Sequence, residues 1–180
     1  MKVDTLIVGF GIAGLNFAEQ LRRHKKSFVV MAPMKESASH LAAGIINPTV
    51  LKRFNPVWKA EVFLDFALPL YNNLEELVKF KIIHPLPIYR ILNSIQEQNE
   101  WSVAASSPLL EKYLNKEWIS EAYQSEIKAP YGFGEVIQSA RVDNKALLKH
   151  YCNKVIPNQF IVEKVNHSEI HVQEGLIRYK

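Results

Sequence analysis

Cysteine is almost absent from this sequence, because Cys152 is the only one among its 180 residues. A single cysteine cannot close a disulfide within the chain, and it also excludes a C-x-x-C redox pair. A fold held together by a disulfide framework is therefore excluded. The cysteine usage predicts a cytoplasmic protein, since the cytoplasm keeps thiols reduced.

Long hydrophobic runs are missing as well. No stretch of the sequence reaches the ~20 apolar residues that a membrane-spanning helix needs. The first fifteen residues are apolar but rich in glycine, Asp4 precedes the apolar run, and no small-residue cleavage pattern follows it. The sequence therefore predicts neither a signal peptide nor a membrane partner.

Charge is not concentrated anywhere along the chain. The net charge is +4, but the basic residues are dispersed, and their longest cluster, residues 22–26, lies where a predicted helix ends. Cations at that place complement the helix dipole. The cluster has no interleaved aromatic residues and belongs to no recognised module, so we expect no nucleic-acid partner. A hydrophobic content of 48% with 22% charged residues is typical of a globular protein.

Residues that could form a metal site or a catalytic acid–base group are scattered. The six histidines are dispersed, and only His167 and His171 recur at a short spacing. In a strand pattern that spacing separates their side chains by about 13 Å, too far for one metal ion. The sequence predicts no metal site, and it leaves the catalytic residues unidentified.

Glycine is scarce but is spaced informatively near the start of the chain. The segment LIVGFGIAGLNFAEQL, residues 6–21, contains Gly9, Gly11 and Gly14 in the pattern G-x-G-x-x-G. Such a motif binds a diphosphate when it follows a strand and opens a helix, because the helix N-terminus offers free N–H groups. Gly9 would make the tight turn, Gly11 would let the diphosphate approach, and Gly14 would allow close packing of helix against strand.

The surrounding residues supply the context that the glycine motif requires. Residues 6–8 are apolar, as in a buried parallel strand, and the residues after Ile12 recur with helical spacing. A second apolar run, residues 28–31, completes a β-α-β unit. Further on we expect a helix over 57–79 with a kink or break at Pro69, a strand over 88–92, and a helix to about Ala105 that is capped by Ser94 and Glu97. Three alternating segments, 160–165, 169–172 and 176–179, predict a small antiparallel meander.

Three stretches together resemble the FAD-dependent oxidoreductases of the D-amino-acid oxidase type, which include glycine oxidase and sarcosine oxidase. They are VGFGIAGLNFAEQL, the serine- and glycine-containing SASHLAAGIINP at 37–48, and GEVIQSARVDNKALLKHYC with the following FIVEKV. The resemblance implies an α/β fold with a Rossmann-like FAD-binding parallel sheet, an antiparallel meander and an interleaved α+β substrate domain. It assigns 1–50 and 136–180 to a discontinuous FAD-binding domain and 51–135 to part of the substrate domain.

The resemblance also implies the cofactor and its contacts. The cofactor would be FAD, held over the glycine loop, along the 37–48 segment and, at the adenine, by the backbone of Val165. The implied cofactor-binding residues are Gly9, Phe10, Gly11, Ile12, Ala13, Gly14, Ala32, Ser39, Ala43, Gly44, Ile45 and Val165. The implied activity is oxidation of a C–N bond in a small amine or amino-acid-like substrate, with hydride transfer to the flavin.

The sequence departs from the family pattern in two ways. Dinucleotide-binding proteins usually end the second strand with an acid that holds the ribose hydroxyls, and here that position is Ala32. Glu36 or a backbone group would have to replace it. The sequence also stops after EGLIRYK, before the next strand that the family would supply. We therefore expect an N-terminal part of a larger enzyme, which alone binds FAD weakly and turns over no substrate.

Two other functions are compatible with the residues. Ala32 removes an acid that would repel the 2′-phosphate of NADP, and Lys35 lies near enough in sequence to attract one, so an NADP-binding oxidoreductase domain is an alternative. The 37–48 segment argues against it, because a plain nicotinamide-binding domain has no use for such a segment. A non-enzymatic binding module with a vestigial glycine loop is the second alternative.

An amino-acid-like substrate would need a clamp for its carboxylate, and arginine with tyrosine is the usual solution. Tyr89 and Arg90 on the predicted substrate-domain strand are candidates, as are Lys52, Arg53 and Tyr131. Each of them alone is more readily explained as a solvated or interface residue.

Overall fold

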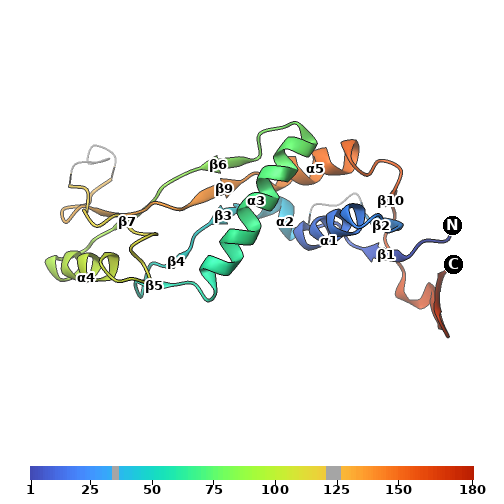
Figure 1. Cartoon of the computed structure of the whole chain (residues 1–180), viewed down its shortest axis with the longest axis horizontal. Coiled ribbons are helices and arrows are strands. Elements are labelled where there is room, and N and C mark those ends of the chain that lie inside the picture. The colour runs from blue at the N-terminus through green and yellow to red at the C-terminus, as the bar shows by residue number, and fades with distance from the viewer. Residues whose placement is uncertain (34–36, 121–126) are drawn as a thin grey trace. The chain divides into compact units, whose positions relative to one another are not determined.

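The computed structural model describes residues 1–33, 37–120 and 127–180 (Figure 1). These residues form a mixed α/β fold that divides into two compact units. The first unit combines Met1–Ala42 with Asn144–Lys180, and the second is Ala43–Asp143. The first unit is thus discontinuous in sequence, whereas the second is a single insertion.

A parallel sheet with the strand order β1-β2-β10 forms the centre of the first unit. Its strands are β1 (Thr5–Val8), β2 (Phe28–Ala32) and β10 (Phe160–Val162). β2 is the middle strand and is nearly all buried, as the continuous apolar run of residues 28–31 predicts. Val8 pairs with Met31 and Val162 pairs with Ala32, so the three strands end at the same edge of the sheet.

The α-helices in the described residues of the first unit are α1 (Ile12–Arg23), α2 (Ala38–Leu41) and α5 (Asn144–Lys154). α1 buries Leu15 and Ala18, and α5 buries Leu147 and Leu148. Both α1 and α2 pack against α5. In the part of the chain that the structure describes, no helix has the length and apolar character needed to cross a membrane.

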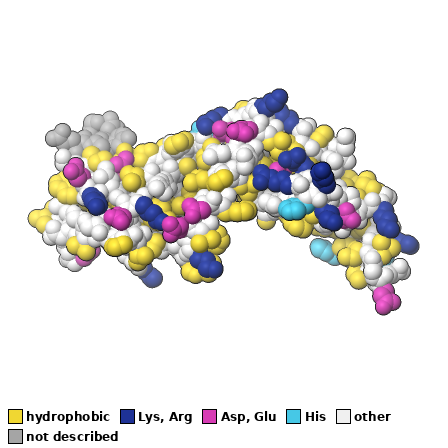
Figure 2. All heavy atoms as spheres, viewed as in Figure 1, with side chains coloured by type: hydrophobic (Ala, Val, Ile, Leu, Met, Phe, Trp, Pro, Cys, Tyr) yellow, Lys and Arg dark blue, Asp and Glu magenta, His cyan; other side chains and the backbone are white. Residues whose placement is uncertain are grey.

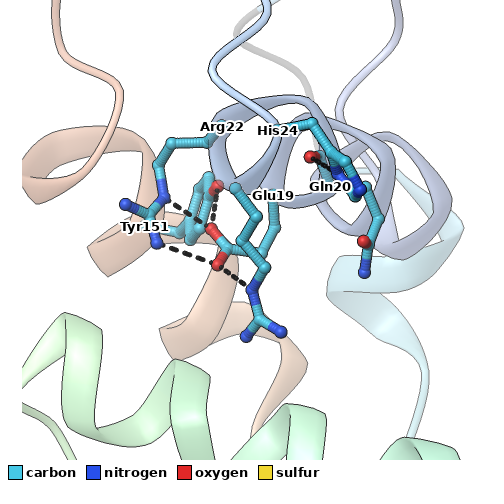
Figure 3. Close-up of polar contacts among 6 residues, drawn as sticks. Glu19, Gln20, Arg22, His24 and Tyr151 are labelled. Atoms are coloured by element: carbon cyan, nitrogen blue, oxygen red, sulfur yellow. Dashed lines mark hydrogen bonds and ion pairs between the residues drawn. The ribbon is translucent and has the colours of Figure 1, made fainter.

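A buried carboxylate joins α1 to α5. The side chain of Glu19 is only 1% exposed, and the Arg22 guanidinium donates to both of its oxygens, at 2.8 and 2.9 Å (Figure 3). Arg23 donates to the same carboxylate at 2.7 Å, and the Tyr151 hydroxyl of α5 donates to it at 2.9 Å. Burial opposes ionisation of Glu19, but these donors outweigh it and lower its pKa below the ordinary 4.5. The helices are therefore joined by a charged group whose hydrogen bonds are satisfied.

We expect Tyr151→Phe to lower the free energy of unfolding by about 1–2 kcal/mol at pH 7, because the buried carboxylate loses a donor. The pKa of Glu19 is lowered in the folded state, so its ionised form stabilises the protein above pH 4.5, and this stabilisation is lost as the pH falls through the lowered pKa. The cost of the substitution should therefore shrink in acid. Urea unfolding at pH 7 and at about pH 3 measures both values.

Tyr179→Phe is a matched control, because the Tyr179 hydroxyl also donates to a glutamate, Glu163, but at a more exposed place. We expect it to have little effect at either pH. An equal cost of Tyr151→Phe at both pH values would show that the hydroxyl does not act through the ionised carboxylate.

The predicted antiparallel meander at the end of the chain is wrong in its first strand. Phe160–Val162 forms β10, which pairs parallel with β2. Of the three predicted segments, the last two correspond to β11 (Ile170–Gln173) and β12 (Leu176–Tyr179), which pair antiparallel as a two-stranded hairpin after the short 3-10 helix His167–Glu169. The short apolar segment of β10 fits beside a buried parallel strand equally well, and apolar content does not reveal the direction of pairing.

The second unit consists of small antiparallel sheets and two longer helices. Its elements are β3 (Ile45–Ile46), β4 (Thr49–Val50), β5 (Asn55–Pro56), α3 (Ala60–Val78), β6 (Ile83–Pro85), β7 (Ile88–Ile91), α4 (Ile95–Ala105), β8 (Phe133–Val136) and β9 (Ala140–Val142). β9 lies between β3 and β6, β4 pairs with β5, and β7 pairs with β8. α4 begins as predicted, because the Ser94 side chain accepts from the backbone N–H of Glu97.

The core of the second unit is built around Trp101 of α4. This residue is fully buried among Leu92, Leu114 and Val136, and its indole N–H donates to the carbonyl of Asn115 at 2.9 Å. The ring lies directly against Gly134 of β8, where a β-carbon would be 2.4–2.5 Å from ring atoms. The absence of a side chain at Gly134 therefore makes room for the largest core residue.

Of the kink or break expected at Pro69, the break does not occur. α3 is continuous from Ala60 to Val78 and contains Pro69 in its interior. Leu70, Leu74 and Val78, which follow the proline, are all buried, and this burial favours continuation of the helix over the cost of the proline.

Candidate functional site

The glycine loop connects β1 to α1 at the carboxyl edge of the parallel sheet. Gly9 has a φ of +96°, which favours glycine, and its N–H donates to the carbonyl of Met31 at 2.8 Å. Gly11 is the N-cap of α1, and its carbonyl accepts from the N–H of Leu15 at 2.9 Å. The loop therefore turns sharply and presents the start of a helix, which carries no acidic residue in its first turn.

The second and third glycines differ in what surrounds them. A β-carbon on Gly14 would lie 2.5 Å from the backbone oxygen of Gly9, so this glycine permits the close approach of α1 to the loop. A β-carbon on Gly11 would meet only serine side chains, with the Ser39 hydroxyl at 2.8 Å. Gly14 is thus required by packing against backbone, whereas a side chain at Gly11 would have to displace the Ser39 hydroxyl.

Ser39 lies beside the glycine loop. Its hydroxyl oxygen accepts from the backbone N–H of Ile12, the first residue of α1, at 3.1 Å. Ser39 lies on α2, and a capping box between Ser37 and His40 begins that short helix, with the Ser37 hydroxyl 2.9 Å from the imidazole Nδ1 of His40. The segment at 37–41 therefore brings hydroxyl groups to the N-terminus of α1.

Ala32 and Val165 lie near the ends of the neighbouring strands. Ala32 ends β2 and is buried, and its carbonyl accepts from the N–H of Glu163 at 3.1 Å. Val165 follows β10 and is also buried. The structure thus places the glycine loop, Ala32 and Val165 along one edge of one sheet. Lys35 and Glu36, which the sequence suggested as phosphate and ribose contacts, lie outside the described residues.

Glu163 is an acid at this edge that the sequence analysis did not single out. Its carboxylate accepts from the Tyr179 hydroxyl at 2.7 Å and from the Lys180 ammonium, and these donors lower its pKa. Neither partner is close to Glu163 in sequence, so only the fold of the β11–β12 hairpin brings them together.

The other residues predicted to bind a cofactor occupy different environments. Phe10 is buried, with its ring 5.2 Å from that of Phe160 and 6.3 Å from that of Tyr151, so its side chain is part of the core. Ile12 and Ala13 begin α1, and Ala13 is exposed.

Ala43, Gly44 and Ile45 belong to the second unit. There the Gly44 carbonyl accepts from the N–H of Val142 at 2.8 Å, and Ile45 pairs with Arg141. The contribution of these three residues to cofactor binding stays a prediction.

Tyr89 and Arg90, the candidates for binding a substrate carboxylate, lie on β7 as expected. The Tyr89 hydroxyl donates to Glu135 at 3.3 Å. The Arg90 guanidinium donates to Glu97 at 3.2 Å and lies 5.6 Å from the ring centroid of Phe54. Both side chains therefore have partners within the second unit.

Lys52 and Arg53 are exposed in the turn between β4 and β5, and Tyr131 is partly buried. The backbone carbonyl of Tyr131 accepts from the Gln98 side chain at 2.8 Å. These residues, like Tyr89 and Arg90, belong to the second unit, whereas the glycine loop belongs to the first, and their role stays a prediction.

Comparison with known proteins shows where this fold occurs. No family model matches the sequence. Among solved structures, the glycine oxidase from Bacillus cereus matches with a TM-score of 0.67 and 18% identity, over 96% of this chain and 49% of that one. The iminodiacetate oxidase from Chelativorans sp. BNC1 matches with a TM-score of 0.69 and 13% identity, over 96% of this chain and 49% of that one. The L-α-glycerophosphate oxidase from Mycoplasma pneumoniae, whose structure has FAD bound, matches with a TM-score of 0.61 and 16% identity, over 98% of this chain and 49% of that one.

The match extends over nearly the whole of this chain, but the chain spans only about half the length of these solved structures. The shared part includes the parallel sheet with its glycine loop as well as the second unit. The protein therefore has the fold of the amino-acid oxidase-like oxidoreductases, the group that its sequence resembles.

Proposed function

We propose that this protein is an FAD-dependent oxidoreductase that oxidises a C–N bond of a small amine or amino-acid-like substrate. The observation that carries the proposal is the glycine loop at the carboxyl edge of a parallel sheet, in a fold shared with amino-acid oxidases. The chemistry that FAD would supply, when bound, is that of a hydride acceptor for the oxidised C–N bond. The residues described here bind and orient the cofactor.

The residues of the loop fit the diphosphate of FAD. Gly11 has no β-carbon, and the nearest groups to that position are the Ser39 and Ser37 side chains, which can rotate, rather than backbone. The N-terminus of α1 supplies N–H donors and the positive end of a helix dipole, and the basic residues Arg22 and Arg23 lie at its other end. A hydroxyl can donate to a phosphate oxygen, so Ser39 adds a further contact.

The positions of the other parts of FAD follow from placing its diphosphate over Gly11. The adenosine half would extend along the sheet edge past Ala32 to the backbone of Val165. Ala43, Gly44 and Ile45 would contribute toward the flavin, with residues 1–50 and 136–180 as the FAD-binding domain and 51–135 as part of the substrate domain. The substrate would be a small molecule.

Titration with FAD and with NADP tests this assignment, and the Ala32→Glu variant sharpens it. We expect the wild-type protein to bind FAD and not NADP. Glutamate at position 32 should strengthen FAD binding about tenfold or more, because a carboxylate pairs with the ribose hydroxyls. It should weaken any NADP binding, because the 2′-phosphate meets a like charge. Flavin fluorescence quenching and calorimetry measure the two affinities.

Ala32→Gln is the matched control, since it has the size of glutamate without the charge. If Ala32→Glu binds NADP more tightly than the wild-type protein does, NADP rather than FAD is the preferred assignment. If neither cofactor binds the wild-type protein, the glycine loop is vestigial and the protein is a binding module of another kind.

A further inference from the structure

One oxygen of the Glu163 carboxylate is held by the protein, and the other is not. Glu163 directly follows β10, and its Oε1 accepts from the Tyr179 hydroxyl at 2.7 Å and from the Lys180 ammonium. Among the residues that the structure describes, no donor reaches its Oε2. The side chain is 29% exposed, so a ligand can reach the carboxylate. Glu163 therefore presents a fixed carboxylate with one oxygen left to accept a hydrogen bond.

Glu163 lies where β2 and β10 end, and Figure 1 shows these two strands side by side. Val162 pairs with Ala32, and the N–H of Glu163 donates to the carbonyl of Ala32 at 3.1 Å, so Glu163 is one residue beyond this last pair. Neighbouring strands lie about 4.8 Å apart. Ligands of open parallel sheets bind outside the carboxyl ends of the strands. An acid that follows β10 is therefore close to the place that an acid at the end of β2 would occupy.

The β11–β12 hairpin fixes this part of the sheet edge. The Tyr179 hydroxyl, which donates to Glu163, also accepts from the backbone N–H of Asn166 at 3.4 Å. It thereby joins the two ends of the segment that contains Val165, whose backbone we assign to the adenine. Lys180 and Tyr179 lower the pKa of Glu163, so the carboxylate is ionised at neutral pH. A carboxylate that is held in place before binding loses little conformational freedom when a ligand arrives.

No other acid in the described part of the first unit directly follows a strand of the parallel sheet. Asp4 precedes β1, at the opposite edge of that sheet, and Glu19 is buried between α1 and α5. Glu169 and Glu174 flank β11 of the hairpin. Figure 2 shows mainly basic side chains over α1 and α5. Among the described acids, Glu163 is therefore the one whose position suits a ligand at the carboxyl edge.

We propose that Glu163 binds the adenosine ribose of FAD, with its Oε2 accepting from a ribose hydroxyl, and so replaces the acid that is missing at Ala32. This inference rests on the FAD-binding function proposed above. A hydroxyl that donates to a carboxylate makes a charge-assisted hydrogen bond, which is stronger than a bond between neutral groups. Because its Oε1 is occupied, Glu163 offers one acceptor oxygen, whereas a carboxylate at position 32 would offer two. Ala32→Glu should therefore still add affinity for FAD, although Glu163 is present.

The affinities of the 180-residue protein for FAD, ADP and 2′,3′-dideoxy-ADP test the proposal. We expect Glu163→Gln to lower the affinity for FAD and for ADP about fivefold or more. The affinity for 2′,3′-dideoxy-ADP, which lacks both ribose hydroxyls, should stay within about twofold of the wild-type value. Glu174→Gln is the matched control, because Glu174 is exposed at the turn of the same hairpin and should leave all three affinities unchanged. Calorimetry gives the affinities, and circular dichroism of each variant shows whether the fold is intact.

A double variant tests whether Glu163 and an acid at position 32 serve the same ribose. In the Ala32→Glu background, Glu163→Gln should lower the affinity for FAD by less than about twofold, because the new carboxylate binds the hydroxyls itself. The inference about Glu163 is overturned, and the proposed function is not, if Glu163→Gln binds FAD like the wild type, loses as much affinity for 2′,3′-dideoxy-ADP as for ADP, or loses equally in both backgrounds. A wild-type protein that binds neither FAD nor ADP would overturn both.

Discussion

Gly134→Ala should destabilise the second unit by about 3 kcal/mol or more, the largest effect that we expect from adding a single methyl group to this protein. The new β-carbon would lie 2.4–2.5 Å from three atoms of the Trp101 indole. The ring is fully buried, and it cannot move aside without stretching its hydrogen bond to the Asn115 carbonyl. Urea unfolding followed by tryptophan fluorescence measures the loss.

Two further variants separate the steric cause from the general cost of replacing a glycine. Gly175 has a φ of +72° and nothing within 4 Å of an added β-carbon, so Gly175→Ala should cost only about 1 kcal/mol, for the backbone conformation. In a Trp101→Phe background the smaller ring should reduce the cost of Gly134→Ala. If Gly134→Ala costs the same in both backgrounds, the contact with the indole is not what excludes a side chain there.

Gly11→Val should lower the affinity for FAD about 100-fold while leaving the protein folded. The added side chain would occupy the space that we assign to the diphosphate, at the N-terminus of α1. Within the protein its first carbon meets only the Ser39 and Ser37 side chains, which can rotate away. The fluorescence of FAD during titration gives the affinity, and thermal unfolding of the ligand-free variant shows whether the fold survives.

Gly14→Ala provides the contrast to Gly11→Val. Its added carbon would lie 2.5 Å from the Gly9 backbone oxygen, and backbone cannot rotate away as a serine side chain can. We therefore expect Gly14→Ala to lower the stability of the first unit even without FAD. Flavin binding by Gly11→Val at wild-type affinity would show that the diphosphate does not lie over Gly11.

The β-α-β unit and its glycine loop could be predicted from the sequence because each part depends on neighbouring residues. The apolar run at 28–31, which follows a helical pattern and a basic turn, indicated a buried strand, and the spacing of Gly9, Gly11 and Gly14 indicated a turn that leads into a helix. The start of α4 at Ser94 was predictable for the same reason. In all these places the local pattern and the fold agree.

Features that depend on distant residues could not be predicted in this way. Glu19 is charged and stands among helical surface residues in the sequence, yet its side chain is 1% exposed, since Tyr151 covers it from another helix. The direction of β10 depends on its pairing with β2, and the continuity of α3 through Pro69 depends on the burial of Leu70 and Leu74. None of these contacts leaves a signal in the nearby sequence.

The glycine loop of the candidate site could be predicted from the sequence, but the prediction of the other parts of the site was incomplete. The hydrogen bond between Ser39 and Ile12 joins residues that are 27 positions apart, so the sequence could name Ser39 only through the resemblance. The acid that the ribose would need is missing at Ala32. Glu163, which lies at the same sheet edge, became apparent only once β10 was placed beside β2.

The discontinuity of the first unit has a consequence for the order of folding during synthesis. The first 42 residues cannot complete their sheet until β10 has left the ribosome. The hydrogen bond between Glu19 and Tyr151 also forms late, because Tyr151 is made 132 residues after Glu19. The second unit, Ala43–Asp143, contains all of its own strands and can close its core earlier. Domains usually fold in the order in which they are made. Here the inserted unit should fold first, and the nascent β1-α1-β2 segment should remain exposed to proteases and chaperones until β10, Phe160–Val162, emerges.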